Sequence, residues 1–161
     1  MNDNDYVIFE VDSYKFAVPS FVVDKVERAV LLTPVPDAPD LVLGVVNDGG
    51  EIVPVLGLRK KMGLIERDAI PSDRLLFSMF NGRRIALLAD SVSSVIEISP
   101  DKAKSADEIW PGVIFLKSFS GLNEDVILVQ DMGAVLDLNQ EQELYEALAA
   151  LAAQGETEAD G

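Results

Sequence analysis

The stretch Gly44-Val45-Val46-Asn47-Asp48-Gly49-Gly50-Glu51-Ile52-Val53-Pro54-Val55 decides the fold. Two runs rich in valine and isoleucine flank the four residues 47–50. β-Branched side chains favour extended backbone, and Asn, Asp and Gly accept the positive φ angles of a tight hairpin turn. The stretch therefore predicts a β-hairpin with strands over 41–46 and 51–55.

The same strand-and-turn pattern continues on both sides of this hairpin. Asn81-Gly82 is a second hairpin turn signal. Further strands are predicted over residues 6–11, 14–18, 21–32, 74–80, 84–89, 92–98, 113–119 and 125–130. Short helices are predicted over 58–62 and 132–138. The many short strands with regular turn residues predict an all-β fold.

The strands form an internal repeat. Val7-Ile8-Phe9 aligns with Leu75-Leu76-Phe77 at a shift of 68 residues, and residues 52–55 align with residues 126–129. Each half then offers five strands in one order, which suits a small SH3-like or OB-like barrel. Chance similarity between strands is the competing explanation. We expect one domain over 1–161, with sub-barrels over about 6–64 and 74–138 in a pseudo-twofold arrangement.

The C-terminus has a different pattern. Leu144, Leu148 and Leu151 lie at i, i+4 and i+7, which predicts a helix over 140–154 with one apolar stripe. Packing of this stripe against the barrels is the first interpretation, and partner binding is the alternative. Gly155 is expected to end the helix and to leave an acidic tail over 155–161.

Composition excludes several classes of function. The net charge of −15 opposes binding to nucleic acid, which depends on Lys and Arg. The absence of histidine and cysteine removes a Ser-His-Asp triad and the usual zinc ligands. No run of eighteen apolar residues and no secretory signal occurs. We expect a cytoplasmic, non-enzymatic protein with no metal, no cofactor, no nucleic-acid partner and no membrane insertion.

Motifs for chemistry are weak. Gly49-Gly50 lacks the lysine and the strand-to-helix context of a phosphate-binding loop. The acidic residues near the loops, among them Asp37, Asp40 and Glu51, do not have the spacing of a calcium-binding loop. Trp110 lies in a polar loop, either as a buried anchor or as a contact for a partner.

Residues 44–59 resemble the signature of the CheW-like chemotaxis coupling family, G-V-x-N-x-R-G-x-I-x-P-V-x-D-L-R. The resemblance covers about residues 6–138 and includes Thr33-Pro34-Val35-Pro36 upstream of the signature. It implies two intertwined, five-stranded SH3-like barrels without enzymatic activity. It also implies two partners, the cytoplasmic tip of methyl-accepting chemoreceptors and the regulatory domain of a CheA-type histidine kinase. The protein would then be recruited to receptor arrays at the inner membrane.

The family's contact residues carry over to this chain by position. The receptor contacts, in a groove between the barrels, fall on Val23, Lys25, Gly44, Gly49, Leu75 and Val95. The kinase contacts, on the first barrel, fall on Tyr14, Leu31 and Val42.

Two positions depart from the signature. Gly49 replaces the usual arginine, and Gly57 replaces the usual aspartate. Loss of the arginine removes a planar donor group that could bind a polar group of a receptor. Two other functions stay open. The chain could be a small-ligand sensor that uses the groove as a pocket, or a divergent CheW-like protein that binds only kinase-type partners in a motility pathway.

Overall fold

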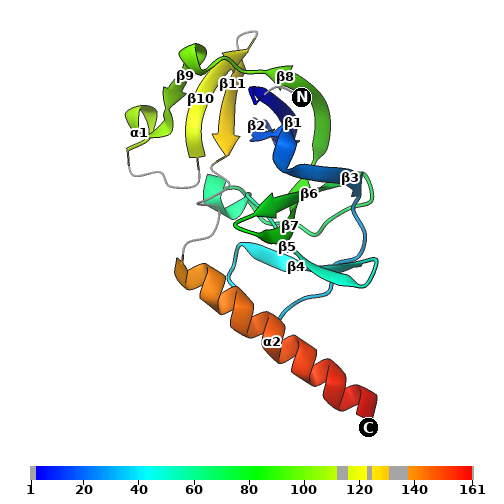
Figure 1. The fold of residues 1–161 in the computed structure, drawn as a ribbon. Coiled ribbons are helices and arrows are strands. Elements are labelled where there is room, and N and C mark those ends of the chain that lie inside the picture. Colours follow the sequence, from blue (N-terminus) through cyan, green and yellow to red (C-terminus); the bar gives the residue numbers. More distant parts are fainter. Residues whose placement is uncertain (1–2, 112–115, 123–124, 131–137, 161) are drawn as a thin grey trace.

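The computed structural model describes residues 3–111, 116–122, 125–130 and 138–160 (Figure 1). The strands in this part of the chain are β1 (Asp5–Val11), β2 (Tyr14–Pro19), β3 (Val23–Arg28), β4 (Val42–Asp48), β5 (Glu51–Leu56), β6 (Arg74–Phe80), β7 (Arg83–Ala89), β8 (Ser91–Glu97), β9 (Ala103–Ser105), β10 (Leu116–Leu122) and β11 (Asp125–Gln130). The α-helices are α1 (Ala106–Ile109) and α2 (Leu138–Asp160), and short 3-10 helices cover Ser20–Val22, Lys60–Met62 and Pro100–Lys102. Within these ranges no helix is long and apolar enough to cross a membrane.

The strands form two sheets, which confirms the all-β prediction. One sheet has the order β8-β1-β2-β11-β10-β9, and the other has the order β3-β6-β7-β5-β4. Each sheet contains one parallel pair, β11 with β2 and β5 with β7, among antiparallel neighbours. The two orders are equivalent when each strand of the first half is exchanged with its counterpart in the second half. The counterparts are β1 and β6, β2 and β7, β3 and β8, β4 and β10, and β5 and β11. The internal repeat is therefore real, and the short β9 is an addition to it.

The sheets do not follow the expected division at 6–64 and 74–138. Strands β1 and β2 of the first half pair with β8 and β11 of the second half, while β6 and β7 pair with β3 and β5. Sequence similarity between the halves cannot show this exchange, because equivalent strands have the same pattern whichever sheet they enter. The two halves are repeats in sequence, and each barrel is built from both.

The alignment of the repeat also needs one correction. Val7 pairs with Val18 across β1 and β2, and Leu76 pairs with Leu87 across β6 and β7, a shift of 69 residues at both positions and not 68. These strands are apolar on both faces, so a one-residue slip leaves the hydrophobic pattern nearly unchanged.

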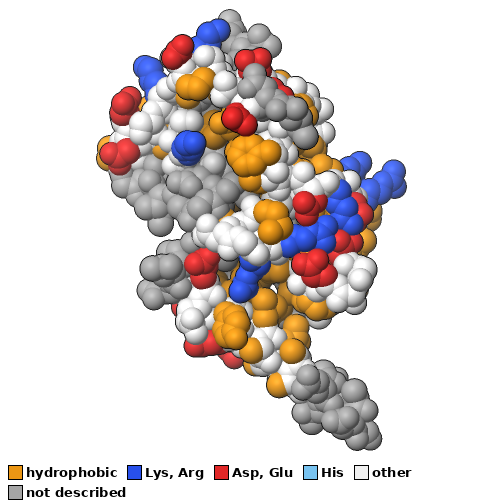
Figure 2. Space-filling model, viewed as in Figure 1, with side chains coloured by type: hydrophobic (Ala, Val, Ile, Leu, Met, Phe, Trp, Pro, Cys, Tyr) orange, Lys and Arg blue, Asp and Glu red, His pale blue; other side chains and the backbone are white. Residues whose placement is uncertain are grey.

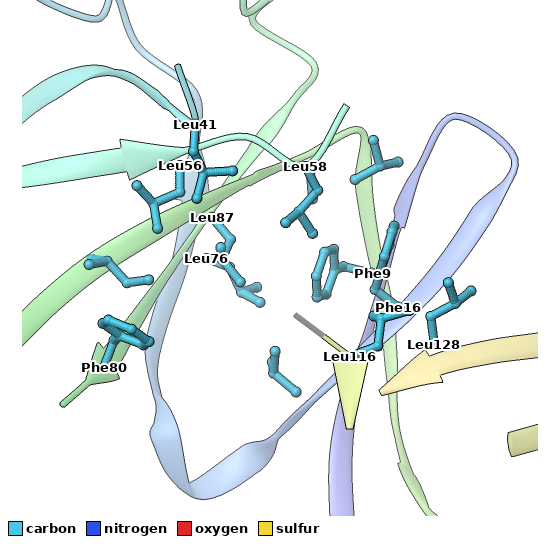
Figure 3. Close-up of a cluster of buried hydrophobic side chains, with 14 of the residues drawn as sticks. Phe9, Phe16, Leu41, Leu56, Leu58, Leu76, Phe80, Leu87, Leu116 and Leu128 are labelled. Carbon is cyan, nitrogen blue, oxygen red and sulfur yellow. The ribbon is translucent and has the colours of Figure 1, made fainter. Parts of the chain in front are cut away.

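A central apolar cluster joins the two sheets. Figure 3 shows side chains from both sheets pointing toward one another, with Phe9, Phe16 and Leu128 facing Leu76 and Leu87. The Phe9 and Phe16 rings stack with centroids 5.4 Å apart. Two smaller clusters of buried residues belong to one sheet each. Because β1, β6 and β7 are buried on both faces, their sequences are nearly continuous apolar runs.

The remaining elements differ from expectation at their ends. Helix α2 runs to Asp160 and so continues through Gly155, since a single glycine costs a helix only about 1 kcal/mol and no proline follows. Leu144 is fully buried, and Leu148 packs against the central cluster, as the stripe predicted. The strand expected over 21–32 is shorter and ends at Arg28. The helix predicted over 132–138 lies almost wholly outside the described residues.

Candidate docking surfaces

Three of the expected receptor residues lie on the two equivalent edge strands. Val23 and Lys25 belong to β3, and Val95 belongs to β8. An edge strand has unpaired backbone groups that a partner can engage. Val95 is 59% exposed, and Val26, its counterpart in the repeat, is 40% exposed. The sequence did not single out Val26, because it does not show which of the two valines of β3 is the more exposed.

Leu75 and Gly44 do not belong to a receptor surface. Leu75 is 1% exposed in the outer cluster of its sheet, so its expected contact with a receptor is wrong. Gly44 is also buried, and a Cβ there would stand 2.7 Å from the carbonyl oxygen of Thr33. This close approach permits the backbone hydrogen bonds between Thr33 and Val45, at 2.8 and 3.0 Å. Gly44 has a structural role.

Gly49 lies at the exposed tip of the β4–β5 hairpin. Gly49 and Gly50 have φ of 62° and 96°, the left-handed values of a two-residue hairpin turn. The Asn47 Oδ1 accepts a hydrogen bond from the Gly50 amide at 2.8 Å. A Cβ on Gly49 would meet no atom within 4 Å. The hairpin therefore has room for the arginine of the family signature, which this chain lacks.

A network of charged side chains surrounds this hairpin. Lys25 Nζ and Arg84 Nη1 donate to the two oxygens of Asp48, at 2.7 and 2.6 Å, and Arg84 Nε donates to Asp24 at 2.8 Å. Both cations also lie about 5 Å from the centre of the Phe77 ring, at 5.0 and 4.9 Å. Figure 2 shows basic and acidic side chains gathered over this region.

The network satisfies its own charges. The hydrogen bonds from Lys25 and Arg84 hold the pKa of the Asp48 carboxyl below its usual range, and the bond to Asp48 raises the pKa of Lys25. The Arg84 guanidinium is mostly buried and faces three carboxylates of this chain, those of Asp24, Asp48 and Glu51. It therefore does not replace the missing arginine as a free donor for a partner.

A second surface is an apolar groove of about 870 Å³ between the chain that follows β3 and the segment before β6. Leu31 lines it and is 96% exposed, and Val30 and Ile70 beside it are also exposed. Tyr14 and Val42 are half-buried and pack against the central cluster. Of the three expected kinase residues, Leu31 is therefore the one that reaches the groove.

The groove includes residues that the sequence did not single out. The sequence predicts that the run from Ala29 to Leu32 is part of a strand, in which alternate side chains would be buried. In the structure β3 ends at Arg28, which leaves Val30 and Leu31 together on the surface. Exposed apolar side chains gathered along one groove are typical of surfaces that bind a partner.

The usual arrangement of metal ligands is not found within the described ranges. No group of three or more acidic side chains there is arranged to hold a metal ion. Trp110 follows α1 and is 41% exposed, so it is not a fully buried anchor.

Comparison with known proteins finds one matching family model and several similar proteins. A family model described as a CheW-like domain matches residues 5–140. The chain is 24% identical over 141 residues to Chemotaxis protein CheW of Bacillus subtilis, covering 84% of this chain and 88% of the relative. It is 33% identical over 90 residues to Protein FrzA of Myxococcus xanthus, covering 56% of each.

The share of each relative that the chain matches differs between relatives. A solved structure gives a separate comparison of the fold. The matched regions span 56% of FrzA and 61% of Chemotaxis protein CheW of Rhizobium meliloti, which is less than two thirds of their lengths. The solved scaffolding protein TtCheW from Thermoanaerobacter tengcongensis superposes with a TM-score of 0.75 at 22% identity, covering 86% of this chain and 96% of that one. This likeness confirms the expected pair of SH3-like barrels.

Proposed function

The chain belongs to the CheW-like family, and we propose that it is a chemotaxis adaptor that joins chemoreceptors to a CheA-type histidine kinase. In this role it contributes two protein-binding surfaces and no bond-making chemistry. The regulatory domain of the kinase binds the apolar groove at Leu31. The cytoplasmic tip of a methyl-accepting receptor binds the edge strands β3 and β8, and the protein acts in the cytoplasm beneath the receptor array.

The exposed groove carries this proposal. Leu31 is almost fully exposed, and Val30 and Ile70 beside it add further apolar surface. Burying apolar surface stabilises a complex by about 25 cal/mol per Å². An exposed leucine does not stabilise the fold of the free protein. A partner's side chain that enters the groove would bury Leu31 and exclude water from it, which stabilises a complex.

The receptor surface rests on different features. Val26 and Val95 are exposed at equivalent positions of two edge strands, one in each sheet. A helical receptor tip that buries these valines gains apolar contact at both strands, and its polar groups can reach the hairpin at Gly49. The missing arginine at this hairpin weakens the receptor contact relative to family members that have it.

Titration of the chain with each partner tests the proposal. Isothermal calorimetry with the kinase regulatory domain should give a complex that Leu31→Ser weakens, while Ile65→Ser leaves it unchanged. Ile65 is 88% exposed but does not line the groove, so it is a matched control. Binding that is equally strong in wild type and Leu31→Ser would move the kinase away from this groove.

Val95→Glu tests the receptor surface in the same way. A charge on β8 should weaken binding of a receptor cytoplasmic fragment. Val126→Glu is the control, because Val126 is also 59% exposed but belongs to β11. Equal loss from both substitutions would show that added charge, and not the site, is responsible.

A further inference from the structure

The two walls of the groove are built differently. Residues 29–34 form one wall, and backbone hydrogen bonds between Thr33 and Val45 attach it to β4. Residues 66–71 form the other wall, within a segment over 64–73 that is neither helix nor strand. A backbone hydrogen bond from the Ala29 amide to the Asp73 carbonyl, at 3.0 Å, holds the end of this segment, and side-chain bonds of Arg67 attach its middle.

Arg67 holds two carboxylates at once. Its Nη1 and Nη2 atoms donate to the two oxygens of Asp73 at 2.7 and 2.8 Å, and Nη2 also donates to Asp90 Oδ1 at 2.9 Å. The Asp73 side chain is 1% exposed, which opposes its ionisation, yet the bonds from Arg67 and the Ile70 amide keep its pKa below the usual range. A planar two-pronged contact of this kind fixes direction as well as distance.

Asp90 extends this attachment to the other sheet. It lies between β7 and β8, where the chain crosses from one sheet to the other. Its carboxylate accepts hydrogen bonds from Arg59 Nη2 at 2.8 and 2.9 Å and from the Asp12 amide, in the β1–β2 turn, at 2.7 Å. Its own amide donates to the Glu10 carbonyl at 2.8 Å. The wall is thus fastened to a rigid junction of both sheets.

The repeat shows that the barrel fold does not require this junction twice. The residue equivalent to Asp90, at a shift of 69, is Phe21, which is 67% exposed. The first half therefore has no carboxylate at this position. The arrangement belongs to the side of the molecule that has the groove.

We propose that Arg67 is a positioning residue for the groove: its bridge from Asp73 to Asp90 holds the wall over 66–71 where an apolar kinase surface can dock. This inference rests on the proposed function, since it assigns the kinase domain to the same groove. It predicts that affinity for the kinase domain depends on an ion-pair network in addition to the apolar side chains that line the groove.

Arg67→Lys separates positioning from folding. Lysine keeps a positive charge beside the buried Asp73, but a single ammonium group cannot reproduce the fork that spans both carboxylates. Backbone amides over 64–70 should exchange faster with deuterated solvent. The Kd for the kinase domain should rise about three- to tenfold, the usual size of effect for residues that act through others.

Two further variants show whether the effect passes through the groove. Asp90→Asn should reproduce the loss of affinity, while Asp40→Asn should not, because the Asp40 carboxylate forms an exposed ion pair with Lys60 and not with Arg67. In a Leu31→Ser background, Arg67→Lys should cause little additional loss, since the groove is already impaired. A general loss of stability would instead weaken both backgrounds equally.

The outcomes are separable. Unchanged kinase affinity in Arg67→Lys, or an equal loss with and without Leu31→Ser, would overturn the positioning role. Unchanged amide exchange over 64–70 would also overturn it. If the wild-type chain does not bind the kinase domain, the proposed function fails, and the exchange measurement still decides whether Arg67 holds the wall.

Discussion

At the scale of single residues, substitution of Leu31 should weaken binding of the kinase domain while it leaves the stability of the fold almost unchanged. Its side chain is almost entirely in water in the free protein, so Leu31→Ser should leave the unfolding free energy within about 0.5 kcal/mol of wild type. Affinity for the kinase domain should fall roughly tenfold, because a central apolar contact is lost. Thermal unfolding and calorimetric titration of the same sample measure both quantities.

Gly49 permits a gain-of-function test. Gly49→Arg restores the residue of the family signature at a position with open space. The left-handed φ of 62° costs about 1–2 kcal/mol of stability with a side chain present. Binding of a receptor fragment should nevertheless become severalfold tighter, because a bidentate donor is added at the hairpin tip. Gly63→Arg, at another left-handed glycine with open space, is the control for backbone strain and added charge. If both variants bind the fragment alike, the signature arginine has no role at this surface.

Asp73 determines part of the dependence of stability on pH. Its pKa is lowered in the folded protein, so its ionised form stabilises the fold at neutral pH, and this contribution is lost as the pH falls below about 3.8 toward the lowered value. Asp73→Asn should therefore be less stable than wild type at pH 7, and the difference should narrow in acid. Urea unfolding at several pH values measures this. A difference that stays constant with pH would show that shape, and not charge, is responsible.

The candidate site was only partly predictable from single residues. Leu31 was expected among the kinase contacts of the first barrel because of the family resemblance, and its exposure agrees with a surface role. Leu75 was expected at the receptor surface but is buried. The sequence could not show this, because β6 has apolar residues on both faces and their pattern does not indicate which of them are exposed. Asp73 is near Arg67 in the sequence, but Asp90 lies between β7 and β8, and only the fold brings its side chain to Arg67.

At the scale of elements, α2 is fixed to the body through a few side chains. Leu144 is fully buried in the central cluster, while its neighbour Tyr145 is largely exposed. The stripe predicted the buried face of this helix correctly. Its C-terminal end was placed too early, because a lone glycine is a weak stop signal without a proline after it.

Leu144→Ala should destabilise the protein by about 2–4 kcal/mol, since it leaves a cavity in the cluster that joins both sheets. Tyr145→Ala, on the exposed face of the same turn, should cost less than about 1 kcal/mol. Chemical denaturation of the two variants compares them directly. Equal effects would mean that α2 does not pack on the body through Leu144.

At the scale of the whole molecule, the exchange of strands makes the two halves interdependent. The positions of most strands could be predicted from the pattern of apolar and turn residues, and the internal repeat could be predicted from the order of these strands. The sheet to which each strand belongs could not be predicted, because the pairing of strands far apart in the chain produces no local sequence pattern. The single central cluster, with side chains from both sheets, is the consequence of that pairing.

Neither half should therefore fold alone. A fragment of residues 1–64 contains β1 and β2 without β8 and β11, and β3 and β5 without β6 and β7. It should show no cooperative unfolding, and neither should residues 65–161. A mixture of the two should recover the circular dichroism of the intact chain. Cooperative unfolding of residues 1–64 alone would contradict the exchange.

The adaptor function is tested most directly by a three-component sedimentation experiment with this chain, the kinase regulatory domain and a receptor cytoplasmic fragment. All three proteins should sediment as one complex, because the groove at Leu31 and the edge strands at Val26 and Val95 are separate surfaces. Leu31→Ser should release the kinase domain alone, and Val95→Glu should release the receptor fragment alone. Mutually exclusive binding of the two partners, or no binding of either, would contradict it.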